Sequence, residues 1–476
     1  MRPLYALLLA AALAGPAAAD ETEPVLDVAA IVQPSLLSGP GYSVAPQAQV
    51  HGFMARFEVT TPFGALTAPS VEMLAVRAAE LPAIEALERA AKSEAFAHAL
   101  AERAKKTGNA VWQVVTNPVD TLIGLPEGVA RYFGKKLDSW GNRAQSASDR
   151  AARTFGADGD PFKTPQAPLG AAREPVPGEP MPPKESKAWY ERVGKEVGRE
   201  VRRQLDYNKM RREMARHLGI DPYTSNPYVN ARLDALAWAA VWGNFSAGMA
   251  LDAIGGTAET VIETTGQLNA MVWQLDPENL REKNRVRIAN WCSDDFALRQ
   301  FLRRGGFNDS LRTSLADELD ALKPAAGCND LVEIGAGTRT ELEARFLVNA
   351  LKLIRRHAGT PGGKLVVAGA AIAWRTPDGR LYLPLPVDWL SWTDAIGAFF
   401  ELPQWREKDK TLLIGGDASM TALRELTARG WTTDVRAAYD GAPAYAEDIS
   451  QGLRRAADEP AVQLCVGDVA ETSGCL

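Results

Sequence analysis

The feature that most constrains this 476-residue chain is an apolar stretch near its middle, from Arg232 to Leu275. Between Ala235 and Leu251 the plainly polar residues are Asn244 and Ser246. A helix that is apolar on every side is either buried in a large domain or inserted in lipid. The rest of the chain is therefore expected either to surround this stretch or to be anchored by it.

Two interpretations of the stretch follow. A bilayer span needs about 17–25 apolar residues, and the run from Ala235 to Leu251 lies at the short limit. The neighbouring segments, in contrast, supply many amphipathic helices with faces to bury. We favour a central buried helical hairpin, bent at Gly255-Gly256, over a membrane span. Burial predicts that Gly248→Leu would overpack the core.

The N-terminus has the three parts of a secretory signal peptide. Arg2 supplies a positive charge, Leu4 to Ala14 form an apolar core, and Ala17-Ala18-Ala19 fit the small-residue cleavage rule. The alternative is a short buried helix. The signal predicts a mature chain that begins near Asp20 in the periplasm or outside the cell, and the Ala-, Arg- and Gly-rich composition is typical of a bacterium.

The cysteine count agrees with export. An even number of cysteines in an exported chain predicts disulfides. The pairing favoured by position is Cys292–Cys328 with Cys465–Cys475, because the second bond would hold the C-terminus. Three pairings of four cysteines exist in principle, and four free thiols remain the alternative.

Alternating and helical patterns predict the elements of the first half. Phe53 to Val59 and the segment up to Ala68 alternate like two half-buried strands, after an irregular stretch from the cleavage site to about Ala48. A helix is expected from Ser70 to about Lys106, kinked or restarted at Pro82. Val111 to Phe133 is cut by prolines into short amphipathic segments, which either pack on the core or lie at a membrane surface.

Two further helices have charged surfaces that could be mistaken for sites. Lys184 to His217 has a basic face, interpreted as a solvated helix face rather than a phosphate-binding surface. Asp294-Asp295 is interpreted as an N-cap and its neighbour rather than a carboxylate dyad. The residues from Thr338 to Glu341 also predict a capping box. The helix that this capping box starts should end at Gly359.

The C-terminal part changes to β-rich patterns. Lys364 to Trp374 is a continuous apolar run, and a turn at 377–380 returns the chain into Leu381 to Leu385. Thr411 to Ile414, a helix from Ser419 to Arg429 and Trp431 to Val435 form a β-α-β unit, whose two strands should be parallel.

The expected fold class is α+β: a mostly helical body around a central apolar helical hairpin, a short N-terminal β-hairpin and a small C-terminal α/β domain. The Pro- and Gly-rich segment marks the main boundary. The predicted divisions are a signal peptide at 1–19, the β-hairpin with helices at 20–154, a linker at 155–185, a helical domain at 186–329, and a disulfide-braced α/β domain at 330–476.

No catalytic motif is recognisable in the sequence. The segment from Gly415 to Ser419 lies between a strand and a helix but lacks the lysine and spacing of phosphate-binding loops. Gly243 to Gly248 has the wrong spacing for a nucleophile elbow. The sequence indicates no cofactor and no metal site, and the formal net charge of -6 argues against a nucleic-acid partner.

The leading hypothesis is an exported, non-catalytic envelope or secreted protein that binds or scaffolds an envelope protein or a surface ligand. One alternative is an extracytoplasmic hydrolase that uses Asp or Glu residues on a cell-wall, glycan or lipid substrate. Another is a membrane-associated assembly factor with peripheral membrane contact.

Overall fold

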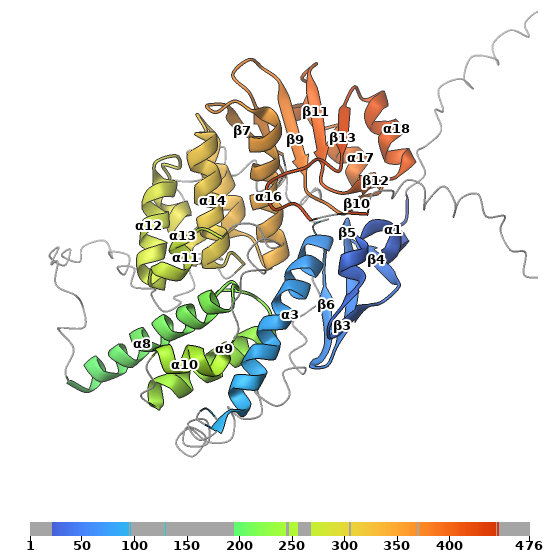
Figure 1. The fold of residues 1–476 in the computed structure, drawn as a ribbon. Coiled ribbons are helices and arrows are strands. Elements are labelled where there is room, and N and C mark those ends of the chain that lie inside the picture. Colours follow the sequence, from blue (N-terminus) through green and yellow to red (C-terminus); the bar gives the residue numbers. More distant parts are fainter. Residues whose placement is uncertain are drawn as a thin grey trace, which may run out of the picture.

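The computed structural model describes residues 21–94, 96, 129, 195–243, 247–255, 268–303, 306–368, 371–443 and 445–446 (Figure 1). These residues form the mixed α+β class predicted from the sequence. Several predicted features lie outside them: the signal peptide, nearly all of Val111 to Phe133, the linker at 155–185, Cys465 and Cys475.

The N-terminal sheet is larger than the predicted hairpin. The hairpin itself is confirmed: β5 (Met54–Thr61) and β6 (Gly64–Ala68) pair antiparallel, with Phe57 opposite Ala68. Short strands before it complete the order β1-β4-β5-β3-β2, with β6 on the other edge of β5. These strands are β1 (Val25–Asp27), β2 (Ser38–Gly39), β3 (Tyr42–Val44) and β4 (Gln47–His51), and the short helices α1 (Val28–Ile31) and α2 (Pro34–Leu37) lie between them. The prediction of an irregular stretch up to Ala48 is therefore wrong, because strands of two to five residues are too short to show a clear alternation of apolar and polar residues.

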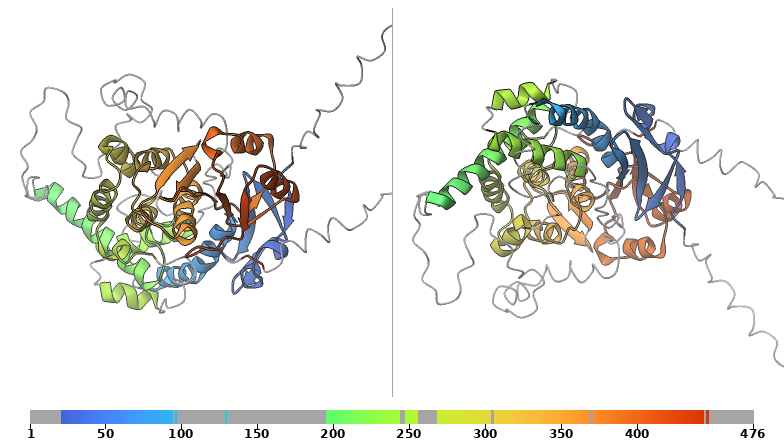
Figure 2. Two further views of the ribbon diagram at one scale, coloured as in Figure 1. Left: turned by 90° about the horizontal axis from the view of Figure 1, so that it is seen from above. Right: turned by 90° about the horizontal axis from the view of Figure 1, so that it is seen from below.

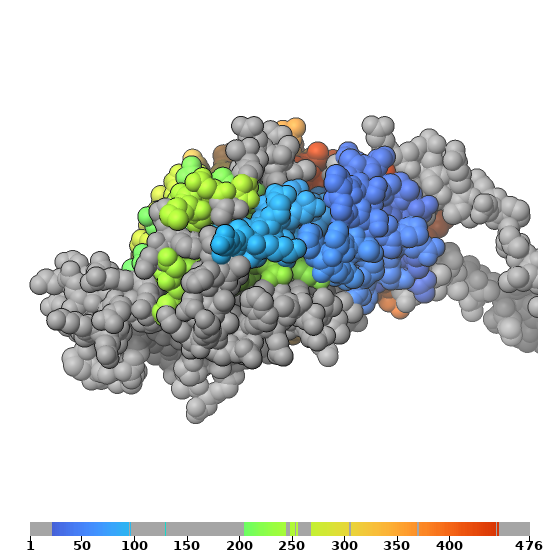
Figure 3. All heavy atoms as spheres, turned by 60° about the horizontal axis from the view of Figure 1, so that its bottom comes forward, coloured from blue at the N-terminus to red at the C-terminus, as the bar shows by residue number. Residues whose placement is uncertain are grey.

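Four helices make the lower part of the molecule in Figure 1. They are α3 (Val71–Lys92), α8 (Lys195–His217), α9 (Pro227–Trp242) and α10 (Ala247–Ile254). The predicted start of α3 is confirmed, since the Ser70 hydroxyl accepts a hydrogen bond from the Met73 amide. α3 runs through Pro82 without a break. Figure 3 shows α3 on one face of the molecule, between the N-terminal sheet and the residues of α9 and α10.

The central apolar hairpin is not confirmed. The chain forms α9 up to Trp242 and α10 from Ala247, and both helices pack against α3 and α8. α9 is largely buried, but α10 exposes Gly248 and Met249 to solvent while Ala250 and Ile254 are buried. Gly255 has the positive φ expected of a bend, and residues 256–267 lie outside the described part of the chain. The interpretation of Gly248 as a core contact is therefore wrong.

A second group of helices follows. These are α11 (Met271–Gln274), α12 (Pro277–Ala289), α13 (Asp295–Arg303), α14 (Asp309–Leu322), α15 (Cys328–Ala336) and α16 (Glu341–Ala358). α12 and α16 both pack against α14, and α13 packs against α15. The capping box of α16 lies two residues later than predicted: Thr340 accepts from the Glu343 amide, and Glu343 accepts from the Arg339 amide. Two threonines in the same pattern made the register ambiguous, whereas the C-cap at Gly359 is confirmed by its φ of 66°.

The C-terminal sheet has the order β13-β11-β9-β8-β7. Its strands are β7 (Lys364–Ala368), β8 (Ala371–Arg375), β9 (Leu381–Leu385), β11 (Lys410–Ile414) and β13 (Thr432–Val435). The predicted β-α-β unit is confirmed, because β11 and β13 are parallel and α18 (Met420–Ala428) connects them. The apolar run from Lys364 to Trp374 is two antiparallel strands rather than one. α16 packs on β8 and β9. β10 (Trp389–Leu390) and β12 (Asp417–Ala418) form a small parallel pair, and α17 (Asp394–Phe400) and a 3-10 turn, η4 (Pro403–Trp405), lie between these two strands in the chain.

The two sheets meet beside the start of α3. The Phe53 carbonyl accepts hydrogen bonds from the amides of Asp388 and Trp389, and the Glu21 amide donates to the Trp392 carbonyl. The views in Figure 2 place the N-terminal sheet beside the C-terminal segments, while α8 extends from the opposite side. Buried residues from the N-terminal sheet, the helices and the C-terminal sheet join in one hydrophobic cluster.

Candidate functional site

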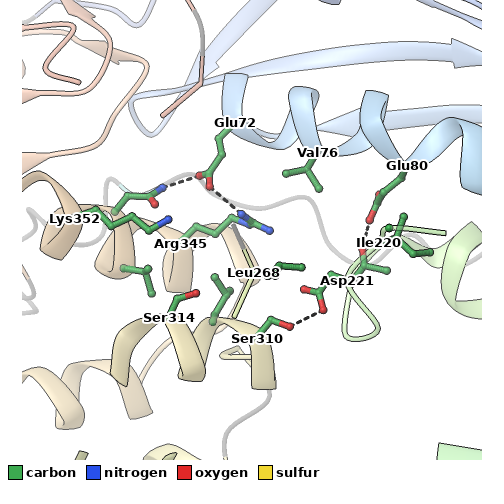
Figure 4. A pocket seen from close by; sticks show the side chains of 15 residues that line it. Glu72, Val76, Glu80, Ile220, Asp221, Leu268, Ser310, Ser314, Arg345 and Lys352 are labelled. Carbon is green, nitrogen blue, oxygen red and sulfur yellow. Dashed lines mark hydrogen bonds and ion pairs between the residues drawn. The ribbon is translucent and has the colours of Figure 1, made fainter. Parts of the chain in front are cut away.

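A cavity of about 50 Å³ lies where helices from both halves of the chain meet. α3 lines one side, α14 and α16 line the other, and the loop at 218–226 between α8 and α9 closes one end (Figure 4). A bound water needs roughly 10–15 Å³ of such space. The cavity therefore has room for a few waters or for one small organic molecule.

α3 presents two carboxylates to the cavity. Glu72, Val76 and Glu80 follow each other at four-residue spacing, so they share one face of the helix. Glu72 is held at both oxygens: Oε1 accepts from Arg345 Nη1 at 2.8 Å, and Oε2 accepts from Asn349 Nδ2 at 2.7 Å. Glu72 thus ties α3 to α16.

Glu80 is also fully engaged. Its Oε2 accepts from Arg77 Nη1 at 2.8 Å and from Asn226 Nδ2 at 2.7 Å, and its Oε1 accepts from the Thr224 hydroxyl. Arg77 Nη2 donates to Ser225 at 2.6 Å. These hydrogen bonds connect α3 to the loop between α8 and α9, so Glu80 serves to fix the loop.

α16 contributes a cationic face. Arg345, Val348, Asn349 and Lys352 line the cavity together, because residues three or four positions apart share one face of a helix. Arg345 pairs with Glu341 at 2.7 Å as well as with Glu72. Burial acts to lower the pKa of Arg345, but these two carboxylates hold it above its ordinary value. Arg345 is therefore a charged centre with its partners already in place.

Lys352 differs from Arg345 in having no such partner. Among the residues that the structure describes, none forms a hydrogen bond or an ion pair with its ammonium group, although the side chain lines the cavity (Figure 4). Burial lowers the pKa of Lys352, and the field of Glu72 and Glu318 opposes this shift. The side chain is half-buried, and a partly desolvated charge without a hydrogen-bonded partner carries a cost. This ammonium group is therefore available to a ligand in the cavity.

Asp221 lies across the cavity from Lys352 in Figure 4. Its Oδ1 accepts from the Tyr223 amide at 2.8 Å and from the Ser310 hydroxyl at 2.5 Å. No hydrogen bond to Oδ2 comes from the described residues. Burial raises the pKa of Asp221 to about 6, although the two hydrogen bonds and Arg345 act to lower it.

A second buried carboxylate, Asp388, lies outside this cavity. Its Oδ2 accepts from the amides of Ala55 at 2.9 Å and Val71 at 3.2 Å, and its Oδ1 accepts from the Tyr445 hydroxyl at 2.8 Å. Burial raises the pKa of Asp388 to about 7. Because both carboxylate oxygens already accept hydrogen bonds, we interpret Asp388 as a structural residue that connects the two sheets to the start of α3.

The residues singled out by the sequence have structural roles where the structure describes them. Cys292 and Cys328 form the predicted disulfide, with Cα atoms 4.9 Å apart. Asp294 accepts from the Ala297 amide as the predicted N-cap, and Ser419 accepts from the Ala422 amide after the glycine turn. No cluster of His, Cys, Asp and Glu suited to a metal ion occurs in the described ranges.

The residues of the cavity could not be recognised from the sequence. Glu72 and Glu80 on α3, Arg345 and Lys352 on α16, and Asp221 in the loop come from three separate parts of the chain. The available signal was a row of charged residues beside the buried face of each helix. A solvated helix face gives the same pattern, so the signal does not identify a site.

Within the described residues no helix combines the length and apolarity needed to cross a bilayer. We find no match for this chain among protein-family models, curated proteins or solved structures.

Proposed function

We propose that this chain is an exported, non-catalytic binding protein that holds a small polar ligand in the cavity between α3, α14 and α16. The observation that carries the proposal is the half-buried Lys352 side chain, whose ammonium group has no partner among the described residues and lines the cavity. Ligand sites combine an apolar wall with a few placed polar groups, and this cavity has both.

Two features support the exported location. The first 19 residues have the charge, apolar core and cleavage site of a signal peptide. The Cys292–Cys328 disulfide is of the kind that persists in oxidising compartments. A periplasmic or secreted protein with a small buried cavity fits a binding role, and the ligand's source would be the envelope or the medium.

The test is a thermal-shift screen of the purified protein against small polar compounds. A ligand that binds only the folded state stabilises it by about 2.7 kcal/mol at a concentration 100 times its Kd, so the melting temperature should rise. The rise should disappear in Lys352→Met and persist in Lys364→Met, which changes an exposed lysine on β7. A screen without any shift, or a shift that survives Lys352→Met, would overturn the proposal.

A carboxylate-based hydrolase is the second candidate. Glu72, Glu80 and Asp221 line one cavity, and burial raises the pKa of Asp221 into the range of a general acid. Against this role, Glu72 and Glu80 are saturated by Arg and Asn donors, which leaves Asp221 without a free carboxylate partner. Turnover of a cell-wall, glycan or lipid substrate that is lost in Asp221→Asn would favour this candidate over the binding protein.

A further inference from the structure

We propose that the ligand of this cavity is a small zwitterion: an α-amino acid with a short aliphatic side chain. Its carboxylate would bind the Lys352 ammonium, and its ammonium group would bind Asp221 Oδ2. This inference rests on the proposed function, because it names the ligand class for the same cavity.

Two groups of opposite charge face the cavity with hydrogen-bonding capacity left unused. Lys352 has no hydrogen-bond partner among the described residues, and Asp221 uses one of its two oxygens. Figure 4 shows the two side chains at opposite ends of the cavity, with Arg345 between them. One molecule that carries both charges would satisfy both ends at once.

The charge balance around the cavity also favours a zwitterion. Around the cavity, two arginines face three glutamates that they bind directly: Arg77, Arg345, Glu72, Glu80 and Glu341. These groups sum to one negative charge, which the Lys352 ammonium cancels. Ionised Asp221 then leaves one negative charge in excess.

This balance disfavours a simple anion as the ligand. An anion bound at Lys352 would add a second excess negative charge beside Glu72, and like charges in a poorly solvated site repel strongly. A simple cation at Asp221 would neutralise the excess but would leave Lys352 without a partner. A zwitterion adds no net charge and gives each end a charge-assisted hydrogen bond.

The remaining walls suit a short aliphatic group. Val76, Ile220, Leu268, Leu311 and Val348 line the cavity between its polar ends. Ser314 lies one helical turn after Ser310 on α14, and its hydroxyl has no hydrogen-bond partner among the described residues. It provides a further polar contact beside the apolar wall.

The experiment is isothermal titration calorimetry of the purified full-length protein with L-alanine, L-valine, propionate and ethylamine. Propionate lacks the ammonium group and ethylamine lacks the carboxylate. We expect at least one of the two amino acids to bind, and both single-charge analogues to bind at least roughly ten-fold more weakly, as expected for the loss of a charged hydrogen bond. Lys352→Met and Asp221→Asn should each weaken amino-acid binding by roughly 10–100-fold, and Lys364→Met should leave it unchanged.

The outcomes separate this inference from the proposed function. Propionate or ethylamine binding as tightly as the amino acid would overturn the zwitterion and leave a small-ligand protein standing. The same holds if neither amino acid binds while another small compound gives a Lys352-dependent thermal shift. If no compound binds, both proposals fail. The analogue comparison uses the unaltered protein, so it remains decisive even if a variant does not fold.

Discussion

Asp388 shows how one side chain connects parts of the chain that are more than 300 residues apart. Its carboxylate accepts from an amide of β5, from the first amide of α3 and from the Tyr445 hydroxyl. Val71 is the first residue of α3, so its amide has no partner within the helix and needs an acceptor. Burial nevertheless favours the protonated form of Asp388 and raises its pKa from 3.8 to about 7.

This shift predicts a pH dependence of stability. Between about pH 4 and pH 7 the folded chain binds more protons at Asp388 than the unfolded chain does. The contribution of this group is therefore complete below about pH 4 and is lost as the pH rises through 7. Asp388→Asn should remove this pH-dependent contribution. The unfolding free energy of the variant minus that of the wild type should therefore increase by a few kcal/mol as the pH rises from about 4 to about 7.

Urea denaturation at several pH values measures this difference. Asn retains an acceptor oxygen for the two amides and offers a donor to Tyr445, so the variant should fold. Asp252→Asn, at an exposed position on α10, is the matched control and should leave the pH profile unchanged. If the unfolding free energies of Asp388→Asn and the wild type change with pH in parallel, Asp388 does not titrate in this range.

At the scale of elements, local signals were the most reliable part of the sequence. Ser70 and Ser419 cap the helices that they were expected to start, because a short polar side chain before a helix satisfies a free amide. The central hairpin expected around the run from Ala235 to Leu251 was not confirmed, for a different reason. Whether an apolar helix lies at the centre or at the edge depends on what packs against it, and the hydrophobic pattern does not contain that information.

Pro82 in α3 gives a prediction at the same scale. The residue is exposed, lies inside a 22-residue helix and cannot donate the usual hydrogen bond to the Ala78 carbonyl. Pro82→Ala should raise the unfolding free energy by about 1–2 kcal/mol, since the restored hydrogen bond outweighs the greater freedom of the unfolded chain.

Chemical denaturation tests the Pro82 variant. Arg89→Ala, also exposed on α3, is the control and should change the unfolding free energy by no more than about 0.5 kcal/mol. A loss of stability in Pro82→Ala would mean that the rigidity of Pro82 contributes more to the folded chain than the restored hydrogen bond does.

At the scale of the whole molecule, the sequence could predict the fold class but not the site. The cavity combines side chains from residues 72–80, 219–224, 268, 310–314 and 345–352. Their meeting depends on the docking of α3 between the N-terminal sheet and the helices. No motif encodes that docking, because each charged residue taken alone resembles one on a solvated helix surface.

The disulfide supplies the last prediction, which concerns the stability of the whole chain. Cys292 and Cys328 are buried, and their bond closes a loop with a sequence separation of 36, so it should stabilise the protein by about 3–4 kcal/mol through the unfolded state. We expect Cys292→Ala/Cys328→Ala to lose this amount in urea denaturation without reductant. With dithiothreitol the unfolding free energies of the variant and the wild type should agree within about 1 kcal/mol. Cys465 and Cys475 are present in both proteins, so any contribution they make cancels in this comparison. Equal stability of the two proteins without reductant would show that the bond does not form in the isolated protein, and would remove one support for an exported location.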